Sequence, residues 1–156
     1  RHAVALALIV ALAGCGYGFA AGAGRMPAGA ESVLVRPLAN RTADAEAGML
    51  VAAALRAELA RRGAAGGDGA PARLEGTVLE SSAALSSPDG STWLLTLEVE
   101  ARLLAGDRLL GEVRVRRWES YMGEVDALAT EGRRRVALRR ASEEAARELL
   151  ERLEQP

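Results

Sequence analysis

A pair of alternating segments joined by a short turn constrains the fold more than any other feature of this 156-residue chain. From Trp93 to Leu104 every second side chain is apolar, which is the period of a strand with one buried face. Gly106-Asp107 predicts a tight turn into a second strand, from Arg108 to Tyr121. The first strand's buried face is expected to carry Leu95, Leu97, Val99, Ala101 and Leu103. A hairpin with one apolar face requires a second layer of structure to cover it.

The second strand of this hairpin repeats the alternation up to a break near its end. Its apolar face is expected to carry Leu109, Gly111, Val113 and Val115, opposite Glu112, Arg114 and Arg116. The order is interrupted at Arg117-Trp118, where we expect a β-bulge that turns Trp118 inward.

The segment before the hairpin predicts a strand, a helix and a second strand. Residues 32–38 are apolar and β-branched with Pro37 near the end, and residues 40–42 are typical of a turn. A helix is expected over 46–62, with Asp44 or Thr42 as its N-cap and Gly63 as its C-terminal cap. Its buried stripe comprises Val51, Leu55 and Leu59. Residues 74–82 predict the next strand, and residues 86–91 a loop.

The last element is a long helix over about 126–154. Its apolar stripe comprises Leu138, Ala141, Ala145, Leu149 and Leu153. The element order is therefore β-α-β-β-β-α, in which each strand has one apolar face. We predict an α+β fold, a small two-layer sandwich with two helices packed on one face of a four-stranded sheet. We expect residues 31–156 to form this single domain.

The N-terminus has the pattern of a bacterial lipoprotein signal. Arg1 and His2 precede an uncharged apolar run over 3–13, which is too short for a transmembrane helix of about 20 residues. Small residues then lead to Cys15, whose thiol would receive a diacylglyceryl group after cleavage of residues 1–14. The alternative is a buried helix with an incidental cysteine, but glycines at positions 14, 16 and 18 would break that helix.

The same pattern predicts a location in the cell. Residues 15–30 are rich in Gly and Ala and are expected to form a lipidated tether. Acyl chains such as palmitate on Cys15 would anchor the protein firmly, since two or more chains hold far better than one. Gly16, in place of an Asp, favours the outer membrane. We therefore expect a lipid-anchored, periplasm-facing protein of the cell outer membrane.

Composition after Cys15 excludes several kinds of chemistry. The only His is His2 and the only Cys is Cys15, so no Ser-His-Asp or Cys-His arrangement and no zinc site is expected. Residues 63–69 lack the Lys and Ser/Thr of a phosphate-binding loop. A net charge of −1 argues against a nucleic-acid partner. Glu98 and Glu100 share a strand face and would suit a hydrolase, but alternating charges usually mark a solvated face. We expect no enzyme, cofactor or metal.

Two groups of arginines remain as candidate binding residues. Arg114, Arg116 and Arg117 lie on the last strand, and guanidinium groups there could bind the phosphates of a lipid head group bidentately. The alternative is a solvated face neutralised across the hairpin by Glu98, Glu100 and Glu112. The arginines of the last helix (Arg133, Arg134, Arg135, Arg139 and Arg140) are interpreted as its solvated face.

Short segments along nearly the whole chain resemble one known family in the right order. They are Cys15-Gly16-Tyr17 with Phe19, Met26-Pro27, residues 33–42 (VLVRPLANRT), residues 55–59 (LRAEL), Arg62-Gly63, residues 74–78 (LEGTV), and Tyr121 ahead of an Arg- and Ala-rich helix. Together they resemble the outer-membrane lipopolysaccharide-assembly lipoproteins, the LptE family.

The resemblance implies a small α/β sandwich that plugs a large outer-membrane β-barrel. With that barrel it would form the translocon that inserts lipopolysaccharide into the outer leaflet, and it would assist folding of the barrel and bind lipopolysaccharide. Under this hypothesis Arg114, Arg116 and Arg117 are the candidate lipopolysaccharide contacts. Two alternatives stay open: an accessory, pilotin-like lipoprotein for a secretin or another barrel, and an envelope hydrolase that uses Glu98 and Glu100.

Overall fold

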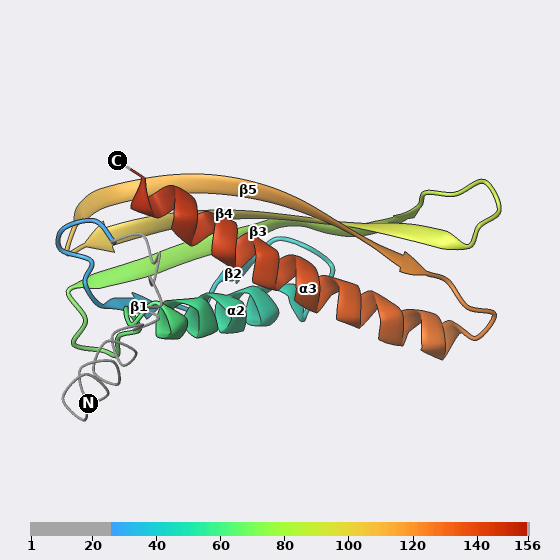
Figure 1. Ribbon diagram of the computed structural model, residues 1–156, viewed down its shortest axis with the longest axis horizontal. Helices are drawn as coiled ribbons and strands as arrows, with labels where there is room; N and C mark the ends of the chain where they lie inside the picture. Colours follow the sequence, from blue (N-terminus) through green and yellow to red (C-terminus); the bar gives the residue numbers. More distant parts are fainter. Residues whose placement is uncertain (1–25, 156) are drawn as a thin grey trace, which may run out of the picture.

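The computed structural model describes residues 26–155 of the chain, so the predicted signal, Cys15 and the first part of the tether lie outside the described residues (Figure 1). The helices are α2 (Ala47–Arg61) and α3 (Ala127–Glu154). The strands are β1 (Val33–Val35), β2 (Ala39–Asn40), β3 (Ala72–Leu85), β4 (Thr92–Ala105) and β5 (Arg108–Met122). Met26 and Ala30, at the end of the expected tether, are buried against the domain.

The strands form one mixed sheet. Its order is β1-β3-β4-β5, and β2 also pairs with β3. The hairpins β3–β4 and β4–β5 are antiparallel, whereas β1 and β2 run parallel to β3. The strand expected over 32–38 is therefore shortened to β1, because Pro37 has no N–H to donate to a ladder. A second short strand, β2, follows at Ala39–Asn40, where Asn40 was expected in a turn.

Both helices cover the same face of this sheet, which confirms the predicted α+β sandwich (Figure 1). We call this the inner face and the opposite one the outer face. The five predicted apolar side chains of β4 are fully buried on the inner face. They pack with the stripes of α2 and α3, including Leu55, Leu59, Leu138 and Leu149, which are also fully buried. The central layer of the sandwich is therefore built almost entirely from Leu, Val and Ala.

The expected bulge at Arg117-Trp118 is wrong. Pairing of β4 with β5 runs without a shift from Leu103↔Gly111 to Thr92↔Met122, and the irregularity lies beside the turn, at Leu110. Trp118 consequently faces outward and is 55% exposed. The regular alternation places Arg117 on the inner face. Its charge is accommodated there because the guanidinium forms an ion pair with Glu148 of α3. The bulge at Leu110 also leaves Leu109 half exposed instead of buried.

The predicted capping of the first helix also needs correction. Glu46 occupies the N-cap position of α2 without a side-chain cap bond. Asp44 lies two residues earlier and accepts a hydrogen bond from the Glu46 N–H at 3.3 Å, while its other oxygen is used by Ser81 and Arg134. In α3, by contrast, Asp126 is an ordinary N-cap that accepts from the Leu128 N–H at 3.0 Å.

The two layers differ in length. Strands β3, β4 and β5 and helix α3 extend well beyond α2 (Figure 1). We call the projecting part, residues 83–94 and 118–136, the distal end. The buried residues of α3 begin only at Ala137, so its first turns lie outside the core. Within residues 26–155, no helix has the length and apolar character needed to cross a membrane.

Candidate functional site

The outer face of the sheet carries a ladder of paired charges in its central part. Glu98, Glu100 and Arg102 of β4 alternate there, and β5 contributes Glu112, Arg114 and Arg116. Arg114 Nε lies 3.0 Å from Glu98 Oε1, and Arg102 Nε lies 2.6 Å from Glu112 Oε1. Arg116 pairs with Glu80 of β3 and, at 2.9 Å, with Glu98. This central part of the outer face is thus polar and close to electrically neutral.

The structure places the three predicted strand arginines on different faces. Arg114 and Arg116 lie side by side on the outer face, each about half exposed and each already facing a carboxylate. Arg117 lies on the inner face, where it pairs with Glu148 and ties β5 to α3. Only Arg114 and Arg116 therefore form a row that an external phosphate can reach.

The carboxylates of the outer face do not form a separate acidic pair. Glu98 stands between Arg114 and Arg116, and Glu100 lies 3.9 Å from Arg114. The Ser82 hydroxyl and the Arg116 guanidinium hold the pKa of Glu80 below its usual range. The hydrogen bond to Glu112 and the negative charge of its carboxylate raise the pKa of Arg102. These contacts are those of a structural ion-pair ladder. The described residues also contain no group of three potential metal ligands.

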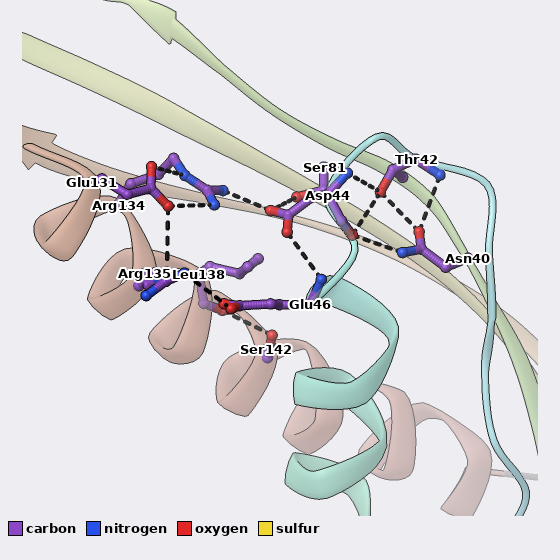
Figure 2. A network of polar contacts seen from close by, with 10 residues as sticks. All are labelled: Asn40, Thr42, Asp44, Glu46, Ser81, Glu131, Arg134, Arg135, Leu138 and Ser142. Atoms are coloured by element: carbon purple, nitrogen blue, oxygen red, sulfur yellow. Dashed lines mark hydrogen bonds and ion pairs between the residues drawn. The ribbon is translucent and has the colours of Figure 1, made fainter. Parts of the chain in front are cut away.

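A second polar network joins three separate parts of the fold at the base of the distal end (Figure 2). Asp44, in the loop before α2, accepts hydrogen bonds from Ser81 Oγ of β3 at 3.1 Å and from Arg134 Nη1 of α3 at 2.6 Å. Arg134 also holds Glu131 through two hydrogen bonds, of 2.8 and 2.9 Å. The next residue, Arg135, forms an ion pair with Glu46, with 3.2 Å between Nη2 and Oε1. This network fastens the exposed first turns of α3 to the sheet.

The loop that presents Asp44 is shaped by its own side chains. Asn40 Oδ1 accepts from the N–H of Thr42 at 3.0 Å and from its hydroxyl at 2.8 Å, and Asn40 Nδ2 donates to the Asp44 carbonyl at 2.7 Å. Burial pushes the pKa of Asp44 upward, but the hydrogen bonds and charge of Arg134 and the Ser81 bond outweigh it, so the pKa is lowered. The ionised form of Asp44 is therefore the one that the fold uses.

Sequence reasoning missed this network. Arg134 was expected on a solvated face, and Asp44 only as a helix cap. The spacing of Asn40, Thr42 and Asp44 is a local signal for a structured turn. No local pattern, however, identifies a partner 90 residues away.

The distal end exposes most of the large apolar side chains that are accessible in the described part of the chain. These are Leu85, Leu94, Trp118, Met122, Val125, Leu128 and Val136. On the inner face, Trp93 and Tyr121 stack with ring centroids 6.3 Å apart and line a cleft of about 680 Å³ between the β3–β4 hairpin and the start of α3. Clustered exposed apolar groups of this kind mark a surface that contacts another molecule.

Several solved structures share this fold, and some of them are lipoproteins by their descriptions. A candidate lipoprotein from Caulobacter crescentus is 21% identical, with a TM-score of 0.63 over 81% of this chain and 90% of its own. The rare lipoprotein B from Shewanella oneidensis is 18% identical, with a TM-score of 0.54 over 78% and 92%. PelC from Paraburkholderia phytofirmans, a dodecamer, is 19% identical, with a TM-score of 0.53 over 85% and 95%.

The family comparison covers nearly the whole domain. No curated protein matches the chain. The model of the LptE family, described as lipopolysaccharide-assembly, matches residues 30–153. This range contains all five strands and both helices, except the final residue of α3. This range includes the outer-face ladder and the Asp44 network. The protein is therefore a member of the LptE family, the non-enzymatic outer-membrane lipoproteins of lipopolysaccharide assembly.

Proposed function

We propose that this protein is the lipid-anchored plug of an outer-membrane β-barrel that inserts lipopolysaccharide into the outer leaflet, and that it helps this barrel to assemble. The family match over residues 30–153 carries the proposal. Cys15 would hold the protein to the membrane through its acyl chains, with residues 1–14 removed as the signal peptide.

The geometry of the outer face supports a place inside a barrel. The lumen of a large outer-membrane barrel is polar and hydrated. A sheet face covered by paired Glu and Arg side chains can lie against such a wall without burying an unpaired charge. The apolar core, in contrast, is sealed between sheet and helices.

We further propose that Arg114 and Arg116 contact the phosphates of lipopolysaccharide. A phosphate would have to compete with Glu98 and Glu80 for these guanidinium groups. Such an exchange is accessible because both arginines are about half exposed and exposed ion pairs are weak. Arg117, the third candidate, points to the helix layer and would support this row by fixing β5 in place.

Affinity purification of the full-length lipoprotein from detergent-solubilised outer membranes tests the proposed partner. We expect one large β-barrel at equal stoichiometry, together with bound lipopolysaccharide. A secretin or another barrel in its place would support the pilotin-like alternative and reject the translocon. Recovery of the lipoprotein alone would reject both.

A further inference from the structure

Strand β5 has an open edge, and the direction of its backbone groups can be worked out. Within the described residues β5 pairs only with β4. In a strand the backbone groups of successive residues point alternately to the two sides. The Gly123 N–H donates to the Ser91 carbonyl, at the end of β4, at 2.7 Å. Because the register is continuous from Gly111 onward, the N–H and C=O groups of even-numbered residues must point to the open edge.

Helix α3 protects only the first part of this edge. Arg152 Nη1 donates a hydrogen bond of 3.2 Å to the Arg114 carbonyl, which agrees with the direction just assigned. Further along, the open-side backbone groups of Arg116, Trp118, Ser120 and Met122 have no hydrogen-bond partner among residues 26–155. A free edge of this length offers a ready template for another strand.

A groove runs beside this unprotected edge, between β5 and the first turns of α3. Its volume is about 460 Å³. Its lining includes Ser120, Tyr121 and Met122 of β5 and Gly132, Val136 and Arg140 of α3. The helix leaves room here because α3 buries no residue before Ala137, and a Cβ on Gly132 would have no neighbour within 4 Å. The groove can therefore receive small side chains.

The charge of the groove selects among occupants. Its lining includes Arg133 and Arg140 but no carboxylate. Arg133 pairs with Glu124, whereas Arg140 forms no ion pair within the part of the chain that the structure describes. The cleft between α2 and α3, in comparison, carries Glu58 and Glu143 beside its arginines. The groove thus favours a segment that brings its own carboxylate.

The outer face beside the same edge is apolar. Leu94 pairs directly with Ser120, so Trp118 and Met122 are its diagonal neighbours on β5. The exposed fractions of Leu94, Trp118 and Met122 are 36%, 55% and 50%. An incoming strand would find apolar contacts on this side and the groove on the other, and this alternation is the signature of recognition by strand addition.

We propose that the distal edge of β5, from Arg116 to Met122, binds an extended segment of another polypeptide as an added β-strand. Every second side chain of the added strand enters the groove; these side chains are small and apolar, with one carboxylate near Arg140. The side chains between them are apolar and cover Leu94, Trp118 and Met122 on the outer face. The proposal goes beyond the proposed function, which names a partner but no mode of contact.

Hydrogen exchange tests the strand directly. The full-length lipoprotein is compared alone and in the complex purified from outer membranes. We expect the amides of Arg116, Trp118, Ser120 and Met122 to exchange freely in the isolated protein. In the complex their exchange should slow at least about 100-fold, because each donates to the added strand. Unchanged exchange of this segment in the complex would overturn the proposal.

Variants and cross-linking separate a strand from other occupants. Ser120→Pro removes one open-edge N–H that the fold does not use, and Ser120→Ala keeps it. We expect Ser120→Pro to associate about tenfold more weakly with its partner and Ser120→Ala to associate as the parent protein does. The circular dichroism spectrum should be unchanged in both variants. A photo-reactive residue at position 136 should cross-link in cells to one segment of another polypeptide, and one at position 139, in the other cleft, should not.

The outcomes of the cross-linking are distinct. Cross-links from position 136 to lipid, to a second copy of this chain or to nothing would each overturn the added strand. A polypeptide that is not a lipopolysaccharide-translocon barrel, with the β5 amides protected, would support the added strand and reject the proposed function.

Discussion

Asp44 shows how much one side chain can hold together at the residue scale. It accepts hydrogen bonds from the α2 entrance, from Ser81 on β3 and from Arg134 on α3. Its side chain is only 9% exposed, so its charge depends on these donors for stabilisation. The loop from Asn40 presents it in the required position.

Asp44→Asn is expected to lower the free energy of unfolding by about 2 kcal/mol at neutral pH, since a charge-assisted hydrogen bond is lost and Arg134 loses a partner. The pKa of Asp44 is lowered in the fold, so its contribution is present above the ordinary Asp pKa, about 3.9, and is lost as pH falls below it. Urea melts between pH 3 and pH 7 should therefore show a smaller pH dependence in the variant. Asp107→Asn, in the exposed β4–β5 turn, is the control, and equal profiles for both variants would contradict the prediction.

The arginine row of the outer face gives a second prediction for single residues. Arg114→Ala with Arg116→Ala should weaken lipopolysaccharide binding about tenfold, because charge-assisted bonds to phosphate are lost. The domain should stay folded, because both guanidinium groups are about half exposed, but the melting temperature should fall modestly because Glu98, whose side chain is 15% exposed, loses both ionic partners. Arg139→Ala, on α3, is the matched control. Unchanged binding at fixed salt would exclude the row as a contact.

Cys15→Ala tests the anchor. We expect the variant to be lost from the outer membrane, because one thiol carries all the acyl chains. It should be held in the inner membrane by its uncleaved signal peptide, or be soluble in the periplasm if another protease releases it. Cell fractionation with mass measurement of the N-terminus checks this expectation. A variant that remains in the outer membrane at parental levels would show that Cys15 is not the anchor.

At the scale of elements, α3 consists of two parts with different roles. From Ala137 onward it supplies core residues such as Leu138, Leu149 and Leu153. Before Ala137 it is exposed and held by the Asp44–Arg134–Glu131 network. The helix is therefore continuous in hydrogen bonding but not in packing.

Two leucine substitutions in α3 should show this difference. Leu149→Ala removes a fully buried side chain and should cost about 2–5 kcal/mol of stability. Leu128→Ala changes a side chain that is 82% exposed and should alter stability by less than about 0.5 kcal/mol. Chemical denaturation of the two variants measures both values. Similar losses in both would mean that the first turns of α3 are packed as tightly as the rest.

At the scale of the whole molecule, stability and exposed apolar surface occupy opposite ends. The sandwich under α2 contains the buried Leu, Val and Ala side chains, whereas the distal end exposes Trp118, Met122 and Leu128. A protein that must fold alone before it meets a partner can keep its contact surface outside its core in this way.

Hydrogen exchange along the isolated protein should follow this division. We expect the slowest amides in β4 around Val99 and in α3 around Leu149, and faster exchange over residues 127–136, which pack against little. Arg134→Ala should speed exchange over 127–136 alone, because it releases the network that holds them. Uniform protection along α3 in the parent protein would argue against a separate distal end.

Much of this protein follows from local patterns in its sequence. The alternation around Leu95 to Leu103, the turn at Gly106 and the stripe from Leu138 to Leu153 are periodic signals, and the α+β sandwich they predict is confirmed. The ordered family segments likewise predict the LptE family, and the family match over residues 30–153 confirms it. The Cys15 pattern is equally local, and its lipidation stays a prediction.

The tertiary structure alone decided which charges meet. Whether Arg117 faces a helix or solvent depends on where the β4–β5 bulge falls, because a bulge shifts every later side chain to the other face, and here it falls at Leu110. The partnership of Asp44 with Arg134 and the open edge beside Ser120 likewise exist only after distant segments have been brought together. Periodicity specifies the face on which a side chain lies, but the partner across a layer is determined by how the layers pack.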